Sequence, residues 1–212
     1  MLYLAIFLIT VLYILYQSPL MVLKKFQDSM TRFAFGKEKP VLVDSFYACT
    51  DKLINGTEKD MKDYSNKVLI VTNVASKWGL TKQNYTEFVE LSKELREKGL
   101  EILAFPCHQF GSQEPGSPEE ILKFVEKFDA KDRLVFFEKA HVNGKNTREV
   151  FGYLKQELPT EGNDSNDIRW NFTKFLISPD GKPVKRFAPT ESPLSFKSDI
   201  EELLKEIKKS ED

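Results

Sequence analysis

Residues 67–75 (KVLIVTNVA) form an almost continuous apolar run that is rich in β-branched side chains. Such a run is typical of a strand that is buried on both faces of a sheet. Because a strand of this kind needs helices packed against both of its faces, this run constrains the fold more than any other segment. It predicts an α/β domain with a central sheet.

From residue 40 onward, segments of strand character alternate with segments of helical character. Strands are predicted at residues 67–75, 101–106 and 134–137, and a hairpin is predicted at 175–178 and 184–188 around the turn PDGK. Helices are predicted at residues 81–98, 117–128 and 147–157 and after the cap at 198–201. A capping box, Ser117-Pro118-Glu119-Glu120, begins the second of these helices. This order predicts an α/β sheet with helices on both faces.

Residues 1–23 contain no charged side chain. About 20 apolar helical residues cross a hydrocarbon layer, so this segment is long enough to span a membrane. We expect a membrane anchor here. A cleaved signal peptide is the main alternative, although the segment lacks a basic start and a small-x-small cleavage site. Residues 24–39 are then a basic linker, and residues 40–212 form the folded domain.

The orientation of this segment is left open by two opposing signals. The linker carries five basic residues against two acidic ones, which favours a cytoplasmic domain under the positive-inside rule. Four glycosylation sequons, usable only in a lumenal domain, begin at Asn55, Asn84, Asn163 and Asn171. We expect a single-pass membrane protein of the secretory pathway, in the endoplasmic reticulum or at the cell surface. Secretion after signal cleavage is the alternative.

The charge balance and the cysteine and histidine content exclude several classes of protein. The chain has 31 Lys and Arg and 32 Asp and Glu, which argues against nucleic acid as a partner. Two cysteines, Cys49 and Cys107, are too few for a disulfide scaffold or a multi-cysteine zinc module. Two histidines, His108 and His141, make a histidine-rich metal site unexpected. We therefore expect no metal and no bound cofactor.

One loop is a candidate site on physical grounds alone. Residues 73–81 leave the buried strand and enter a helix, at the edge where open α/β sheets bind ligands. The positive end of the helix dipole would stabilise a thiolate at this point. The residue in this loop is instead Trp78, which has no titratable group. Taken alone, the loop is equally consistent with a tryptophan that only packs.

Three ordered blocks resemble the signatures of the glutathione peroxidases: NVASKWGLT (73–81), FPCHQFGSQEPG (105–116) and RWNFTKFLI (169–177). The resemblance extends over roughly residues 40–208. It implies a thioredoxin-like fold, in which helices flank a central mixed sheet, and a thiol or selenol peroxidase ancestry. Here an N-terminal hydrophobic segment precedes that domain.

The resemblance also implies a mechanism and a set of site residues. In this family a selenolate or thiolate attacks the peroxide O–O bond, and glutathione or another thiol then reduces the product. Side chains of Gln, Trp and Asn hold the peroxide, and the resemblance assigns these roles to Gln109, Trp170 and Asn171. Trp78 stands where the family has selenocysteine or cysteine, and His108 stands where asparagine is usual. The implied function is reduction of hydrogen peroxide or lipid hydroperoxides in the response to oxidative stress.

Several explanations of Trp78 remain open at this stage. The chain can be a true pseudoperoxidase that acts as a membrane-anchored binding or scaffold domain. Trp78 can also be a misread codon, because the tryptophan codon UGG lies one base from the selenocysteine codon UGA and from both cysteine codons. Another thiol can replace the nucleophile, although we expect Cys49 and Cys107 to be packed and inert. A disulfide between these two cysteines is also left open.

The segment before the third block is short. It resembles the monomeric, phospholipid-hydroperoxide-type members of the family, which lack the interface loop of the tetrameric members. We therefore expect a monomer with an open site. Four basic residues near the blocks are candidates for facing anionic lipid, and an ordinary solvated surface is the alternative: Lys77, Lys82, Arg169 and Lys174.

Overall fold

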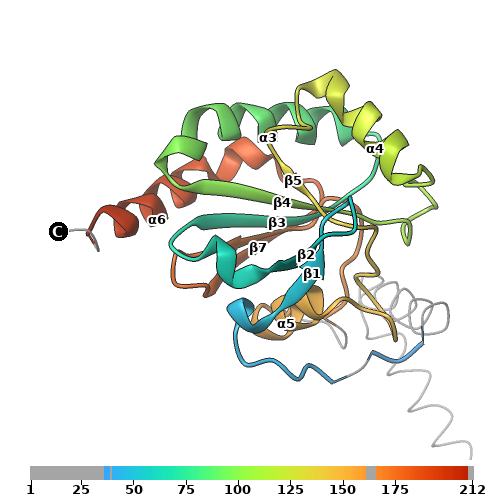
Figure 1. Ribbon diagram of the computed structural model, residues 1–212, viewed down its shortest axis with the longest axis horizontal. Coiled ribbons are helices and arrows are strands. Elements are labelled where there is room, and N and C mark those ends of the chain that lie inside the picture. Colours follow the sequence, from blue (N-terminus) through green and yellow to red (C-terminus); the bar gives the residue numbers. More distant parts are fainter. Residues whose placement is uncertain (1–35, 39, 161–165, 210–212) are drawn as a thin grey trace, which may run out of the picture.

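The computed structural model describes residues 36–38, 40–160 and 166–209 of the chain (Figure 1). The expected membrane anchor at residues 1–23, most of the linker and the sequon at Asn163 lie outside the described residues. In the part that is described, no helix combines the length and the apolar character that crossing a membrane requires.

The central sheet has five strands in the order β5-β4-β3-β6-β7. Strands β3, β4 and β5 are parallel, β6 is antiparallel to β3, and β7 is antiparallel to β6, so the sheet is mixed as predicted. The strand bounds are β3 (Val68–Val74), β4 (Leu100–Pro106), β5 (Val135–Phe136), β6 (Lys174–Ile177) and β7 (Pro183–Phe187). The helices are α3 (Thr81–Leu95), α4 (Pro118–Val125), α5 (Glu149–Glu157) and α6 (Lys197–Lys209).

Side chains alternate between the two faces of the sheet, as the period of a strand requires. On β3, Val68 and Ile70 pack into one apolar cluster, whereas Leu69 and Val71 pack into the other. Helices α3, α4 and α6 cover the first face, and α5 covers the second (Figure 1). Every residue of β3 is buried, which confirms the prediction that the continuous apolar run is a strand buried on both faces.

Most predicted elements are confirmed, with shifts of one or two residues at their ends. The capping box of α4 is present: the Ser117 hydroxyl accepts from the Glu120 N–H, and the Glu120 carboxylate accepts from the Ser117 N–H. The helix predicted over residues 81–98 is α3 followed by a 3₁₀ turn, Arg96–Lys98, and it ends at Gly99 with φ 111°. The predicted cap at Ser198 is wrong, because α6 begins at Lys197 directly after the 3₁₀ turn Pro193–Phe196.

One hairpin was not predicted from the sequence. It pairs β1 (Thr50–Lys52) with β2 (Glu58–Asp60) and lies apart from the main sheet. Its strands are only three residues long and mostly exposed, so they carry no apolar alternation that could have revealed them.

The segment that precedes the first 3₁₀ turn runs along α5 (Figure 1). Gly152 of α5 permits this close approach, because a Cβ atom at this position would lie 3.2 Å from Val41 Cγ2. Glu38 reaches the same helix and pairs with Lys155 at 2.8 Å. The domain boundary at residue 40 stays a prediction, but Glu38 on the linker side of it already contacts the domain.

Candidate active site

The loop that carries Trp78 connects the carboxyl end of β3 to the first turn of α3. Because β3 is the central strand, this loop lies at the edge where open α/β sheets usually meet their ligands. The Thr81 hydroxyl donates to the Ala75 carbonyl at 2.7 Å and accepts from the Trp78 N–H at 3.1 Å. These contacts place Trp78 immediately before a helix N-terminus, as the sequence predicted.

The indole of Trp78 is half-buried and stacks on the ring of Phe172. The ring centroids are 5.6 Å apart and the ring planes are 21° from parallel. Such a pair contributes about 0.5–1.5 kcal/mol beyond the burial of its area. Since the indole nitrogen has no available lone pair, Trp78 offers packing and one hydrogen-bond donor but no nucleophile.

Asn73 on β3 holds the turn at residues 170–173 in place. Its side-chain Nδ2 donates to the Trp170 carbonyl at 3.1 Å, and its Oδ1 accepts from the Thr173 N–H at 3.1 Å. The Asn73 carbonyl also accepts from the N–H of Phe172 at 2.6 Å. These bonds support the left-handed backbone of Phe172, which has φ 60°, a conformation that is rare for a bulky residue. The turn is therefore fixed from the centre of the sheet.

Asn171 is fully buried and contacts a glutamine of the second sequence block. Its Nδ2 donates to Gln113 Oε1 at 2.7 Å, while its own Oδ1 is buried without a hydrogen-bond partner. The carbonyl of Gln113 in turn accepts from the Lys77 N–H at 3.0 Å. Gln113 thereby joins the loop of Trp78 to the turn of Asn171.

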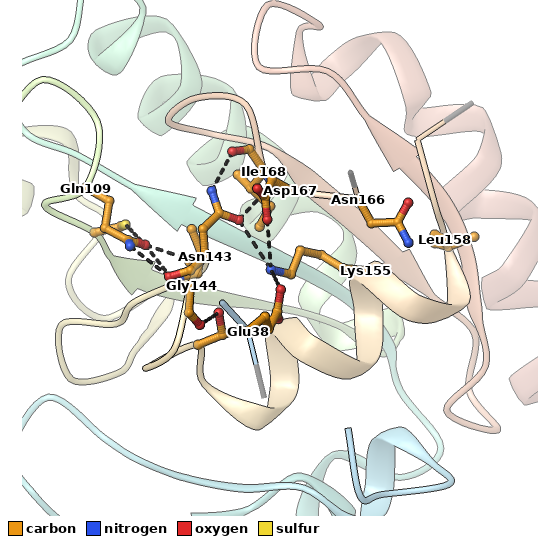
Figure 2. A network of polar contacts seen from close by, with 12 residues as sticks. Glu38, Gln109, Asn143, Gly144, Lys155, Leu158, Asn166, Asp167 and Ile168 are labelled. Carbon is orange, nitrogen blue, oxygen red and sulfur yellow. Dashed lines mark hydrogen bonds and ion pairs between the residues drawn. The ribbon is translucent and has the colours of Figure 1, made fainter. Parts of the chain in front are cut away.

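Gln109, the glutamine assigned from the sequence, points elsewhere (Figure 2). Its Nε2 donates to the Asn143 carbonyl at 2.9 Å, and its Oε1 accepts from the N–H groups of Val142 and Asn143 at 2.7 and 3.1 Å. The structure therefore brings Asn171 together with Gln113 and engages Gln109 with the 142–143 backbone. The sequence offered a second candidate in the same block, Gln113, four residues after Gln109, which sequence reasoning missed.

Trp170 is the most exposed residue of this group, with 36% of its surface accessible. Its ring packs against Phe110 at 5.7 Å between centroids, with the planes tilted by 44°. Trp170 and Asn171 are thus brought together with Gln113 and with the Trp78 loop on one side of the molecule.

A family model described as glutathione peroxidase matches residues 46–155. A probable phospholipid hydroperoxide glutathione peroxidase from Mesembryanthemum crystallinum is 48% identical over 150 residues, which cover 70% of this chain and 86% of that protein. The chain belongs to the glutathione peroxidase family.

Solved structures agree with this membership and with the predicted fold. A crystal structure described as Trgpx in apo form shares 30% identity at a TM-score of 0.61, covering 77% of this chain and 97% of the other. A thioredoxin-family thiol:disulfide interchange protein from Chlorobium tepidum shares 12% identity at a TM-score of 0.55, covering 79% and 99%. The second likeness concerns the fold alone. The thioredoxin-like fold is therefore confirmed.

Both thiols of this glutathione peroxidase family chain are free and fully buried. Burial raises the pKa of Cys49 to about 12, with the nearby Glu149 carboxylate adding to the effect. Burial likewise raises the pKa of Cys107 to about 12. At neutral pH only about one thiol in 10⁵ is then a thiolate, which is the reactive form. Burial therefore disfavours the reactive form of both cysteines, and they do not form a disulfide with each other.

Glu114 is a buried carboxyl group beside the Trp78 loop. Its Oε1 accepts from the Ser76 hydroxyl at 2.7 Å, whereas its Oε2 is buried without a partner. Burial raises the pKa of Glu114 to about 7, and the Ser76 hydrogen bond and the Lys139 charge offset part of that rise. Sequence reasoning missed this residue, because nothing in the block shows that its side chain points inward.

The four basic residues singled out in the sequence do not form one basic surface. Lys77 and Lys82 are exposed, and Arg169 is half-buried. Lys174 is fully buried, and its ammonium donates to the carbonyls of Ala188, Pro189 and Glu191. The proposed role of Lys174 in facing lipid is therefore wrong. A position on β6 points this side chain into the protein, where three carbonyls satisfy it.

No group of three or more His, Cys, Asp or Glu residues suited to a metal ion occurs among the described residues. The expectation that this family member works without a metal or bound cofactor stays a prediction. His108, which stands where the family usually has asparagine, is exposed on the loop after β4.

Proposed function

We propose that this chain retains a glutathione peroxidase site for hydroperoxide reduction but lacks its nucleophile. With tryptophan at position 78, the chain reduces hydrogen peroxide and lipid hydroperoxides with thiols no faster than the uncatalysed reaction. The observation that carries this proposal is the Trp78 indole, stacked on Phe172 at the position of the catalytic selenocysteine or cysteine. The burial of both thiols supports it.

A thiolate at position 78 has a defined reaction to perform. Its sulfur forms a bond to one peroxide oxygen, the O–O bond breaks, and the other oxygen leaves as an alcohol or water after taking up a proton. The sulfur loses two electrons and becomes a sulfenic acid. One external thiol then forms a mixed disulfide and releases water, and a second thiol frees the protein thiol as the external disulfide leaves.

The surroundings of position 78 suit this reaction. Asn171 Nδ2 and the Trp170 indole N–H are donors that can orient a peroxide oxygen. The N-cap position of α3 is Leu80, which supplies no side-chain cap, and the first turn of the helix has no acidic residue. The Thr81 N–H donates to the Trp78 carbonyl at 3.1 Å. The N–H groups that follow it in the first turn, together with the helix dipole, would lower the pKa of a thiol placed there.

The test is a Trp78→Cys variant, assayed for hydroperoxide consumption with glutathione and with a dithiol. We expect a gain of about 100-fold over the unaltered chain, equivalent to about 2.7 kcal/mol of activation barrier. Trp78→Ser is the matched control, because it opens the same cavity without a thiolate. Activity of the unaltered chain that Cys107→Ser abolishes would overturn the proposal, and so would a folded but inert Trp78→Cys variant. The nucleotide sequence at codon 78 tests the misreading alternative directly.

We further propose that the full chain is a single-pass membrane protein of the secretory pathway. The uncharged stretch at residues 1–23 supports this proposal. Asn84 and Asn171 are buried in the folded domain, so Asn55, which is exposed, is the accessible sequon among the described residues. The chain should resist carbonate extraction from membranes. A glycosidase-sensitive mass that Asn55→Gln removes would place the domain in the lumen, whereas a chain found wholly in the cytosol with Met1 intact would contradict the proposal.

We also propose that the chain is a monomer, because the connection between α5 and the turn at residues 170–173 is short. Sedimentation of residues 36–212 over a range of concentrations should give the mass of one chain. A tetramer that does not dissociate on dilution would contradict it.

A further inference from the structure

Asn143 bridges two loops that carry site residues (Figure 2). It lies between β5 and α5 and is fully buried. Its backbone N–H and carbonyl both contact the Gln109 side chain, at 3.1 and 2.9 Å. Asn143 is thereby attached to the loop that also contains Gln113.

The side chain of Asn143 reaches the second loop. Its Oδ1 accepts from the Ile168 N–H at 2.9 Å, and its Nδ2 donates to the Ile168 carbonyl at 2.8 Å. The Asn143 amide thus bonds to both backbone polar groups of Ile168, as a residue on a neighbouring β-strand would. Ile168 lies two residues before Trp170 and three before Asn171, so the clamp acts at the entrance to the turn at residues 170–173.

Lys155 of α5 fixes the orientation of this amide. Its side chain is 3% exposed, and its Nζ lies 3.3 Å from Asn143 Oδ1. Because an ammonium group only donates, Asn143 must present its oxygen to Lys155 and is left with Nδ2 for the Ile168 carbonyl. Two carboxylates compensate the buried charge: Glu38 Oε2 at 2.8 Å and Asp167 Oδ1 at 3.8 Å.

Two hydrogen-bonded connections therefore join the two loops, in addition to the ring contact between Phe110 and Trp170. One connection is the Gln113–Asn171 hydrogen bond at the site, and the other is the buried path from Gln109 through Asn143 to Ile168. The ring contact is non-directional and partly exposed, and one hydrogen bond beside it lets the loops shift, whereas two separated hydrogen-bonded connections fix their spacing. None of the buried connections touches Trp78.

We propose that Asn143, oriented by Lys155, is a positioning residue that sets the spacing between Gln113 and Asn171. The catalytic consequence rests on the proposed function, but the structural consequence does not. Loss of the Asn143 side chain loosens the turn at residues 170–173 even in the unaltered, Trp78-containing chain.

Amide hydrogen exchange in the folded protein tests the structural consequence. The reporters are the N–H groups of Phe172 and Thr173, which bond to Asn73 and not to Asn143. In Asn143→Ala we expect their exchange to be about tenfold faster, while amides of β4 keep their rates. Ser92→Ala is the control, since it loses one buried bond, to the Arg133 carbonyl, outside this region. Unchanged reporter exchange, or an equal increase in β4, would overturn the proposal.

Two milder variants keep the test usable if Asn143→Ala does not fold. Asn143→Asp retains the acceptor for the Ile168 N–H and the contact with Lys155 but loses the donor, so an intermediate increase is expected. Glu38→Gln removes a charge that holds Lys155 and should act in the same direction. Reporter exchange unchanged in both variants would also overturn the proposal.

Rates in the Trp78→Cys background test the catalytic consequence. Adding Asn143→Ala should lower the second-order rate constant for hydroperoxide by about tenfold or more, whereas adding Ser92→Ala should not. Asn143→Asp should recover part of the loss. An active Trp78→Cys chain that Asn143→Ala leaves equally fast would refute the positioning role. Faster reporter exchange with an inert Trp78→Cys chain would refute the proposed function and leave the positioning role standing.

Discussion

The turn at residues 170–173 and the loop at residues 75–80 meet at the stacked rings of Phe172 and Trp78, but they are held by different means. The turn is fixed by two buried asparagines, Asn73 and Asn143, whose side chains bond to its backbone and to Ile168. The loop is held by one threonine hydroxyl, by the bond from Ser76 to Glu114 and by the bond from the Lys77 N–H to the Gln113 carbonyl.

This difference shows which part of the site depends on the residue at position 78. Asn73 and Asn143 contribute to folding whether or not a nucleophile is present, so the turn that carries Trp170 and Asn171 stays in place without one. Trp78 contributes one ring contact to the fold and can be exchanged at small cost to the backbone around it. A chain can therefore lose its nucleophile and still keep the donor geometry.

The largest effect should come from Asn73→Ala. It leaves the Thr173 N–H without its partner and the Trp170 carbonyl with only a 3.3 Å bond from the Thr173 hydroxyl. We expect a loss of about 3 kcal/mol in the free energy of unfolding. In the Trp78 loop, Thr81→Val removes one hydroxyl and should cost about 1.5 kcal/mol. The buried Ala75 carbonyl loses its donor, whereas the Trp78 N–H lies in a partly exposed loop where water can replace the hydroxyl. Denaturant titration measures both values. Equal losses would remove the distinction between the turn and the loop.

Glu114 should make the stability of the Trp78 loop depend on pH. Its pKa rises from 4.5 to about 7 on folding, so between these values the folded state binds more protons than the unfolded state. The stability that protonated Glu114 contributes to the folded state is fully present below pH 4.5 and is lost as the pH rises through 7. The loss amounts to about 3 kcal/mol as an upper bound.

Glu114→Gln tests this dependence. Unfolding measured from pH 4 to pH 8 should show the variant gaining stability relative to the unaltered chain as the pH rises. A difference between the two proteins that does not change with pH would contradict the assignment. The turn at residues 170–173 contains no such titrating group, so the comparison between the two regions predicts pH dependence on one side only.

The two glutamines of the second block should behave differently in the Trp78→Cys background. Gln113→Ala removes the partner of Asn171 and should lower the peroxidase rate by up to about 100-fold. It should cost about 1 kcal/mol in stability, because the buried Asn171 Nδ2 loses its acceptor. Gln109→Ala removes three bonds to the 142–143 backbone and should lower the free energy of unfolding by about 2 kcal/mol. Measuring rate and stability for both variants separates the roles. A larger rate loss with unchanged stability in Gln109→Ala would restore the assignment made from the sequence.

The smallest effect on the peroxidase rate should come from Cys107→Ser. The buried thiol packs among apolar residues, and a hydroxyl there should cost about 1–2 kcal/mol in stability. The peroxidase rate of the Trp78→Cys chain should stay within about twofold, because a thiol with a pKa of about 12 supplies no nucleophile. Abolished activity would show that Cys107 takes part in the reaction.

Much of the fold was predictable because it follows from periodic patterns. The doubly buried run gave β3, the capping box gave the start of α4, and the PDGK turn gave the β6-β7 hairpin. The β1-β2 hairpin was not predictable, since three-residue exposed strands have no period to detect. The false cap at Ser198 has a related cause, because the 3₁₀ turn before α6 lets the helix begin one residue earlier.

The sequence by itself determined the α/β order of the elements, the family resemblance and the presence of Trp78 at the nucleophile position. Only the tertiary structure decided which glutamine faces Asn171, that Lys174 is buried, and that both thiols are inaccessible. The physical reason is the range of the contacts. Strand and helix periods are set by neighbours a few residues apart, whereas the direction of a loop side chain is set by partners far along the chain. Gln109 and Gln113 are four residues apart in an aperiodic loop, and they differ because their partners are Asn143 and Asn171.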